Sequence, residues 1–162
     1  MREEISPLPY EGECKTMMEI PTKQFTETTI EELIIPSEKI AHVQIGNPLE
    51  HALLVLVKSG YSAVPVLTPS YKLEGIISKT IILEEVLGME RFEMERLSVI
   101  KVDAIMKNDI PTLKKYDSLS LGLKKTIDHP FVCVVDEKKQ FDGLLTRRAI
   151  LKKINQMLHA DN

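Results

Sequence analysis

The segment Ile40–Ser78, IAHVQIGNPLEHALLVLVKSGYSAVPVLTPSYKLEGIIS, decides the fold because the chain repeats it once. The second copy is Ile110–Thr146 and reads IPTLKKYDSLSLGLKKTIDHPFVCVVDEKKQFDGLLT. Tyr61 matches Phe131 at an offset of 70 residues, and the ends of the two copies match at an offset of 68. One copy alone is too short to bury a sufficient apolar surface, so we expect two units packed about a pseudo-twofold axis. A repeat can also serve stacking alone, without a ligand.

Each copy predicts the element order β-α-β-β-α. A short apolar strand leads into a helix, for which Asn47 and Asp117 are the expected N-caps and Gly60 the expected stop of the first copy. A β-branched strand, a polar turn and a third strand follow, and an amphipathic helix ends the unit. Short helices are expected before each copy, the first opened by a capping box of Thr29 and Glu32.

The predicted fold is therefore an α/β (α+β) class, with two β-α-β-β-α units packed as a pseudo-twofold pair. We expect a flexible N-terminal arm at 1–24, because this stretch has three prolines and no clean periodicity. The first unit is expected at 25–88, a helical connector at 89–100 and the second unit at 101–160.

Composition excludes several classes of function. A net charge of −3 argues against DNA or RNA as a partner, which requires a basic face. No apolar run reaches membrane-spanning length and no secretory signal opens the chain, so we expect a cytoplasmic protein away from the membrane. The two cysteines, Cys14 and Cys133, do not indicate a disulfide framework.

Neither a metal site nor a catalytic centre is predicted. The four histidines are scattered and, together with the cysteines, show no metal-ligand spacing. No nucleophile motif or phosphate-binding GxxxxGK[ST] loop is present. We therefore expect no enzymatic activity, no catalytic residue and no cofactor.

The element order, the repeated G-h-h-[ST] junction (Gly75–Ser78 and Gly143–Thr146) and the SAVPV strand (Ser62–Val66) resemble the CBS domain. The resemblance covers about residues 29–158. It implies a disc-like pair of CBS units (a Bateman module) with clefts that bind adenosine-containing ligands. The stretches KIAHVQIGN, SGYSAVPVLTPSYKLEGII, FVCV and TRR are similar to the stand-alone CBS-pair proteins of Gram-positive bacteria that bind cyclic di-AMP (the DarB/CbpB group). That resemblance implies a homodimer and, as partner of the ligand-free form, the bifunctional (p)ppGpp synthetase/hydrolase of the stringent response.

The stretch Thr146-Arg147-Arg148 lies where the last strand is expected to pass into the last helix. A helix N-terminus presents free N–H groups and a positive dipole, which disfavours two arginines unless an anion is bound. Arginine binds phosphate through two parallel hydrogen bonds. The alternative is that both arginines are solvated or pair with acids such as Asp142.

The family geometry implies a binding cleft between the copies. On this resemblance, the first copy contributes one wall and the second copy the facing wall, with Ala41 small enough to admit a purine. The implied ligand-binding residues are Lys39, Ala41, Tyr61, Ser62, Ala63, Pro130, Phe131, Leu144, Thr146, Arg147 and Arg148. The other cleft, near Ser78, Lys79 and Thr112, has fewer cationic groups, so we expect it to be empty or weaker.

One departure from the family pattern bears on the ligand. Many nucleotide-binding CBS units continue as [ST]-x-x-D, where the acid holds the ribose hydroxyls, but this chain has Ile81 and Ala149 there. A cyclic dinucleotide has esterified 3′ oxygens and two phosphates, which fits a lost acid and added arginines. We therefore expect a sensor that binds cyclic di-AMP and thereby controls a partner protein. An adenylate regulator that binds AMP or ATP and a ligand-free assembly module remain the alternatives.

Overall fold

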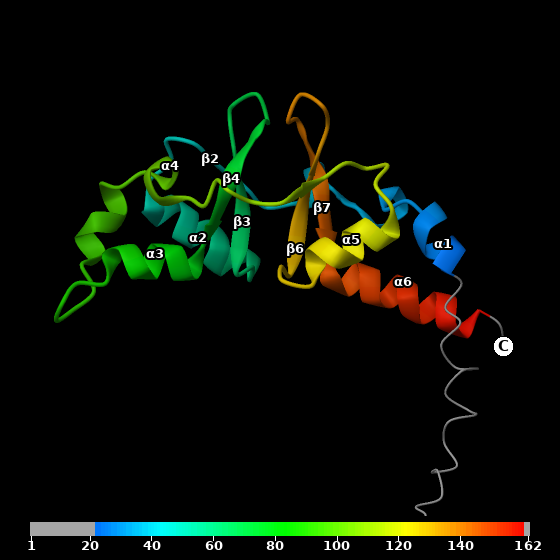
Figure 1. Ribbon diagram of the computed structural model, residues 1–162. Helices are drawn as coiled ribbons and strands as arrows, with labels where there is room; N and C mark the ends of the chain where they lie inside the picture. Colours follow the sequence, from blue (N-terminus) through cyan, green and yellow to red (C-terminus); the bar gives the residue numbers. More distant parts are fainter. Residues whose placement is uncertain (1–21, 161–162) are drawn as a thin grey trace, which may run out of the picture.

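The computed structural model of this chain describes residues 22–160 and contains two units that lie side by side (Figure 1). Its β-strands form a three-stranded sheet in the order β2-β3-β4 and a four-stranded sheet in the order β1-β7-β6-β5. In the first unit the main elements are β2 (Val43–Gln44), α2 (Leu49–Ser59), β3 (Ala63–Leu67), β4 (Leu73–Ser78) and α3 (Lys79–Val86). In the second unit they are β5 (Thr112–Leu113), α5 (Leu119–Thr126), β6 (Phe131–Val135), β7 (Phe141–Thr146) and α6 (Arg147–His159). The predicted fold class and the β-α-β-β-α order of both units are confirmed.

Each unit buries its own apolar core between one sheet and its helices. Val64, Val66 and Ile77 of β3 and β4 pack on α2 and α3 in the first unit. Val132, Val134 and Leu145 of β6 and β7 are the corresponding strand residues of the second. In each sheet the parallel pair (β2 with β3, β5 with β6) and the antiparallel hairpin have the same register.

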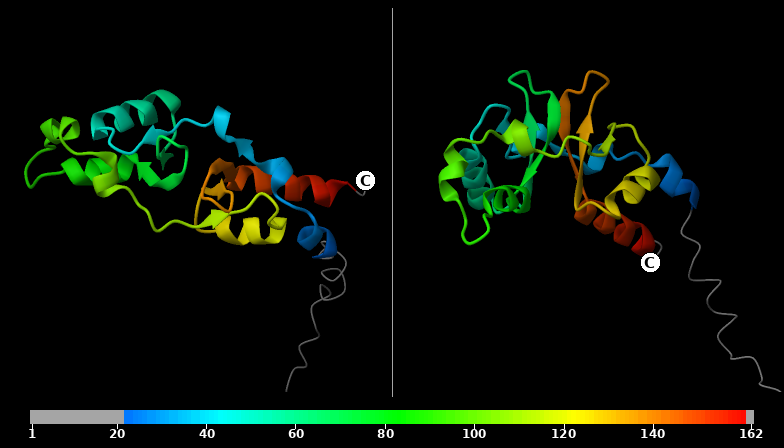
Figure 2. Two further views of the ribbon diagram at one scale, coloured as in Figure 1. Left: turned by 90° about the horizontal axis from the view of Figure 1, so that it is seen from above. Right: turned by 60° about the vertical axis from the view of Figure 1, so that its left-hand side comes forward.

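The segment before each unit packs on the other unit. The first of these segments contains α1 (Thr22–Glu27), η1 (Glu31–Leu33), β1 (Ile35–Pro36) and η2 (Ser37–Lys39). Ile30, in this segment, is fully buried in the core of the second unit, and β1 pairs with β7. The second of these segments contains η3 (Met94–Ser98) and α4 (Val102–Ile105), and its Leu97 and Val102 are buried in the core of the first unit. Figure 2 shows the two crossing connections on opposite sides of the molecule.

The two crossing segments make equivalent hydrogen bonds to the opposite units, as the pseudo-twofold symmetry requires. The Ile30 amide donates to the Asp117 carbonyl at 3.0 Å, and the Val102 amide donates to the Asn47 carbonyl at 2.9 Å. The predicted domain boundaries at 25, 88 and 101 stay a prediction for the order along the chain. In space, however, segments on one side of a boundary pack on the unit from the other side. Residues 25–36 belong with the second unit in space, and part of the expected connector, 89–100, belongs with the first.

Repeated glycines permit the crossing segments to approach the sheets. A Cβ atom on Gly143 would lie 2.1 Å from the Ile35 carbonyl oxygen, and one on Gly75 would lie 2.6 Å from the Lys107 carbonyl oxygen. Both distances are too short for real atoms, so the glycine of each G-h-h-[ST] motif is required by backbone packed against it.

The two hairpins are joined to each other at their tips, where β3–β4 and β6–β7 rise together (Figure 1). The Leu73 amide donates to the Lys139 carbonyl at 3.0 Å, and the Phe141 amide donates to the Tyr71 carbonyl at 2.9 Å. Tyr71 and Lys139 both have φ of 63°, a left-handed conformation at equivalent turn positions. These paired bonds link the two units across the pseudo-twofold axis.

Three predicted caps are wrong in detail. Helix α2 begins at Leu49, after Pro48, because the Asn47 side chain accepts from the Gln44 amide at 2.9 Å and closes the turn after β2. The Asp117 carboxylate likewise accepts from the Lys114 amide, and Ser118 is the N-cap of α5. No side-chain capping bond is formed at η1, so the Thr29–Glu32 capping box is absent. Gly60 is confirmed as the stop of α2, with φ of 74°.

The predicted arm at 1–24 lies mainly outside the described residues. Its last three residues, 22–24, are part of helix α1 and are not a loose tail. Among residues 22–160, no helix combines the length and apolar character needed to cross a bilayer.

Candidate functional site

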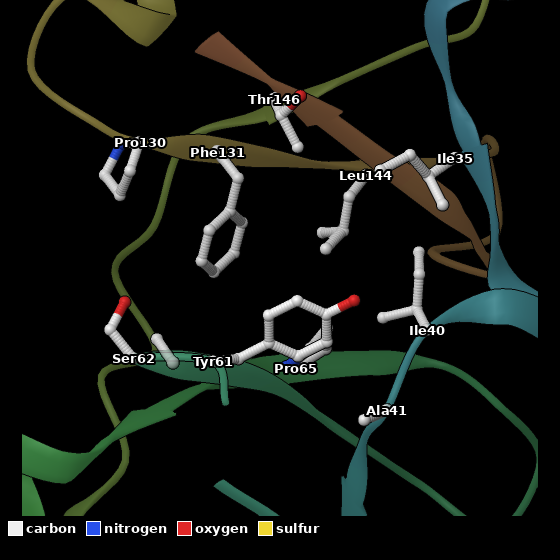
Figure 3. A pocket seen from close by; sticks show the side chains of 11 residues that line it. Ile35, Ile40, Ala41, Tyr61, Ser62, Pro65, Pro130, Phe131, Leu144 and Thr146 are labelled. Carbon is white, nitrogen blue, oxygen red and sulfur yellow. The ribbon is translucent and has the colours of Figure 1, made fainter. Parts of the chain in front are cut away.

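A pocket opens between the two units, with walls from β3 on one side and from β6 and β7 on the other (Figure 3). The space between its walls amounts to about 520 Å³, with the open solvent at its mouth included. Most of the atoms that line it are apolar. The lining residues are Ile35, Ile40, Ala41, Tyr61, Ser62, Ala63, Pro65, Pro130, Phe131, Leu144 and Thr146.

Two aromatic side chains face the pocket from opposite walls. The predicted match of Tyr61 with Phe131 is wrong, because Ala63 pairs with Ser78 as Phe131 pairs with Thr146, which makes Phe131 the equivalent of Ala63. Figure 3 nevertheless shows the rings of Tyr61 and Phe131 both directed into the space between the walls. Tyr61 is 49% exposed, so its ring stands at the mouth. Such surfaces favour a flat aromatic group, which they can contact on its faces.

Thr146 provides a polar group at the point where β7 ends and α6 begins. Its hydroxyl oxygen accepts from the Ala149 amide at 3.1 Å and so caps α6. The hydroxyl proton is still available to donate to a ligand in the pocket. Ser78 caps α3 in the same way through the Ile81 amide, so the [ST] of each motif has a structural role in both units.

Eight of the eleven residues expected at the cleft line this pocket: Ala41, Tyr61, Ser62, Ala63, Pro130, Phe131, Leu144 and Thr146. The three expected cations, Lys39, Arg147 and Arg148, are not among the lining residues. The sequence thus located residues of both pocket walls, and a ligand-binding role of the three cations stays a prediction.

The Arg147 side chain binds the backbone of its own unit and does not line the pocket. Its Nε donates to the Thr126 carbonyl at 2.8 Å, and its Nη2 donates to the Ile127 carbonyl at 3.1 Å. The guanidinium therefore closes the end of helix α5. Among the described residues no ion pair of Arg147 with Asp142 is present, so the alternative of pairing with that acid does not hold for Arg147.

Arg148 and Lys39 remain available for an anion. Both side chains are exposed, and within residues 22–160 neither has a hydrogen-bond or ion-pair partner. Arg148 is the second residue of α6, two positions after Thr146, and Lys39 directly precedes the lining residues Ile40 and Ala41. Both therefore lie close to the pocket lining along the chain.

Sequence reasoning missed three lining residues, Ile35, Ile40 and Pro65. Pro65 follows Ala63 by two positions, so the period-2 alternation of β3 contained the signal. Ile40 is adjacent to two residues that were identified. Ile35 comes from the crossing segment before the first repeat, and nothing in the sequence indicated that this segment packs on β7.

The equivalent cleft on the other side of the pseudo-twofold axis is narrower. It encloses about 280 Å³ and is lined by Ile76, Lys107, Ile110, Pro111, His129, Phe131 and Cys133. Pro111 occupies the position of Ala41, and Phe131 occupies that of Ala63, so larger side chains fill the space. The buried Cys133 thiol has its pKa raised to about 12 because burial disfavours the thiolate.

The described residues contain no set of His, Cys, Asp and Glu side chains that could hold a metal ion. Every buried side-chain nitrogen and oxygen in residues 22–160 has a hydrogen-bond partner. The described chemistry is therefore that of an apolar pocket with a hydroxyl and nearby cations.

Comparison with known proteins gives a consistent result. Residues 30–88 and 102–156 match the CBS domain family. The chain is 43% identical to cyclic di-AMP receptor B of Bacillus subtilis, over 90% of this chain and 99% of the relative. A CBS domain-containing protein of unknown function from Bacillus anthracis is 60% identical, with a TM-score of 0.79, over 84% of this chain and 99% of that one.

A second solved structure contains a ligand. The Listeria monocytogenes CbpB protein in complex with c-di-AMP is 46% identical, with a TM-score of 0.76, over 81% of this chain and 98% of that one. The paired units, their repeated glycine motifs and these matches show that this chain belongs to the CBS domain family, as a tandem CBS pair similar to the cyclic di-AMP receptor and CbpB proteins.

Proposed function

We propose that this chain is a non-enzymatic sensor that binds cyclic di-AMP in the pocket between its two CBS units. The observation that carries the proposal is the pocket itself, which joins both units and lies in a chain 46% identical to a protein solved with c-di-AMP. CBS domains are regulatory, and the similar Bacillus subtilis protein is named a receptor.

The chemistry of the pocket suits one end of such a ligand. An adenine ring can enter between Tyr61 and Phe131, where Ala41 and Ala63 leave room. The phosphates then lie outside the apolar lining, within reach of the Thr146 hydroxyl and the Arg148 side chain. A guanidinium binds a phosphate through two charge-assisted hydrogen bonds, and Arg148 has no competing partner in residues 22–160.

The ligand would act by changing what the surface offers to another protein. By the resemblance to the DarB/CbpB group, we propose the bifunctional (p)ppGpp synthetase/hydrolase as that partner, in the cytoplasm. Control requires that cyclic di-AMP and the partner favour different forms of the sensor or exclude each other.

We also propose a homodimer formed through the helical faces. Leu83 of α3 is 41% exposed, and Leu151 and Leu158 of α6 are 55% and 50% exposed. These leucines lie on the faces of the two helices that are not packed on their own cores, and burying them requires a second chain.

Calorimetric titration of the full chain with cyclic di-AMP, AMP and ATP tests the proposal. We expect cyclic di-AMP to bind most tightly, because no acid at Ile81 or Ala149 holds free ribose hydroxyls. Arg148→Ala is expected to weaken binding by about 10- to 100-fold, since a charge-assisted contact is worth about 1.5–3 kcal/mol. Lys79→Ala is the matched control, a lost cation at the start of α3 in the other unit.

Tight binding of AMP or ATP with no heat from cyclic di-AMP would instead make the chain an adenylate regulator. No detectable binding of any of the three ligands would indicate a ligand-free assembly module.

A further inference from the structure

Helix α5 lacks one of the hydrogen-bond donors that would continue it. In an α-helix the carbonyl of residue i accepts from the amide of residue i+4. For Thr126, the last residue of α5, that residue is Pro130, which has no N–H. At the equivalent positions of the first unit, the fourth residue after Leu56 is Gly60, which has an N–H, and the Leu56 carbonyl accepts from the Ser59 hydroxyl at 3.4 Å within α2, which continues to Ser59.

Arg147 supplies the missing donor from another element. Its Nε donates to the Thr126 carbonyl at 2.8 Å, and its Nη2 donates to the Ile127 carbonyl at 3.1 Å. Its own backbone amide donates to the Pro130 carbonyl at 2.9 Å. One residue thus fixes both ends of the turn between α5 and β6.

This turn carries part of the pocket wall. Pro130 and Phe131 follow it directly and line the pocket, and Phe131 pairs in register with Thr146, the residue before Arg147. In the first unit the corresponding residue, Lys79, makes the backbone bond, to the Ser62 carbonyl at 3.0 Å. Within residues 22–160 its side chain has no hydrogen-bond or ion-pair partner.

We propose that Arg147 is a positioning residue for the pocket, which holds the Thr126–Pro130 turn in place of the amide that Pro130 lacks and makes no contact with the ligand phosphate. Pro130 and Arg147 form a compensating pair, whereas in the first unit the donor to the equivalent carbonyl comes from Ser59 of the same helix. This inference rests on the proposed binding of cyclic di-AMP, but it gives the two adjacent arginines different roles. Arg148 contacts the ligand, and Arg147 fixes the turn that carries the pocket residues Pro130 and Phe131.

The dependence of affinity on salt separates the two roles, because salt screens a direct contact between guanidinium and phosphate. Full-length wild type, Arg147→Ala, Arg147→Lys, Arg148→Ala and Lys79→Ala are titrated with cyclic di-AMP at low and high salt. We expect Arg147→Ala to weaken binding about five- to tenfold while leaving the salt dependence of wild type unchanged. Arg148→Ala should make the affinity depend less on salt, and Lys79→Ala should change neither the affinity nor its salt dependence.

Arg147→Lys keeps the charge but cannot donate to two carbonyls in a fixed fork, so it should restore only part of the affinity. Amide hydrogen exchange at Ile127–Phe131 should be faster in the ligand-free Ala variant, with the rest of the second unit unchanged. A role in overall stability alone would lower the melting temperature without this local signature.

A double-mutant cycle with Pro130→Ala tests the compensation directly. An alanine at 130 restores an amide, so the loss of affinity from Arg147→Ala should be smaller in that background than in wild type. Flattened salt dependence in Arg147→Ala, or additive losses in the cycle with unchanged exchange at Ile127–Phe131, would overturn the inference. Failure of wild type to bind cyclic di-AMP would instead overturn the proposed function, and the exchange measurement would still test the role of Arg147 in the turn.

Discussion

The two CBS units share a fold, a hydrogen-bond pattern and a repeated glycine motif, yet they form unequal clefts. The cleft that contains Ala41 and Ala63 is an open pocket of about 520 Å³, and the cleft that contains Pro111 and Cys133 encloses about 280 Å³. The strand registers that frame the two clefts are equivalent. The comparison therefore attributes the difference in volume to side-chain size, with Pro111 in place of Ala41 and Phe131 in place of Ala63, and not to the backbone.

The units also end their first helix in different ways. Helix α2 runs to Ser59 and stops at a left-handed Gly60, whereas α5 ends three equivalent positions earlier because Pro130 follows. The Thr126 carbonyl at the end of α5 accepts from the Arg147 side chain of α6, whereas the equivalent Leu56 carbonyl accepts from the Ser59 hydroxyl of its own helix.

The largest effect is expected at the tightest contact between a crossing segment and a sheet. Gly143→Ala should lower the free energy of unfolding by about 3 kcal/mol, because its Cβ would lie 2.1 Å from the Ile35 carbonyl oxygen, an atom of the backbone. Chemical denaturation measures this loss. Since Ile35 lines the pocket, cyclic di-AMP binding should weaken as well.

Gly75→Ala is the matched control in the other unit. Its Cβ would lie 2.6 Å from the Lys107 carbonyl oxygen, so a smaller destabilisation is expected, and the open pocket should still bind. Equal stability of Gly143→Ala and wild type would show that the glycine is not required by packing.

Placing a residue of the narrow cleft at the equivalent position of the open cleft should close the open cleft. Ala41→Pro places the side chain of Pro111 at its equivalent position, and we expect cyclic di-AMP affinity to fall by about 10- to 100-fold, the range for an overpacked contact. Calorimetry with Pro111→Ala as the control distinguishes the clefts, because that variant should bind as wild type does at the first site. Unchanged affinity in Ala41→Pro would place the ligand elsewhere.

The reverse transfer should open the second cleft. Pro111→Ala gives it the small residue of the first cleft, and Cys133→Ala removes a further side-chain atom from its lining, so we expect the double variant to show a second, weaker binding event per chain in calorimetry. The variant should also lose about 1–2 kcal/mol of stability from the space created. A stoichiometry that stays at the wild-type value would mean that Lys107 and His129, which also line this cleft, keep it closed.

The smallest effect concerns the thiol that fills the second cleft. Because burial raises the pKa of Cys133 to about 12 from its ordinary 9.0, the thiol is protonated at pH 8, and reaction with a thiol reagent should be slow in the folded Cys14→Ser variant. Between pH 9 and 12 the unfolded chain loses this proton while the folded chain keeps it, so stability should fall as pH rises through this window. Rapid labelling at pH 8 would show that the cleft opens to solvent.

The sequence predicted the elements well where the repeat and its periodicity carried the signal. The β-α-β-β-α order and eight pocket residues, including Tyr61 and Phe131, followed from the matched copies and the CBS resemblance. The crossing of residues 25–36 onto the second unit was missed, because that segment lies before the repeat and its pairing with β7 is set by tertiary contact. The hydrogen bonds of Arg147 to the end of α5 were not predicted, because a helix N-terminus predicts an anion and the contact depends on how α5 and α6 are placed together.

The central claim is that the cleft with Ala41, and not the cleft with Pro111, holds the ligand. Titration of the isotope-labelled full chain with cyclic di-AMP, followed by backbone amide chemical shifts, tests it most directly. The account predicts the largest shift changes at Ala41, Ser62 and Thr146–Arg148, with small changes at Lys107, Ile110 and Thr112. The largest changes at that second set, with the first set unmoved, would contradict it.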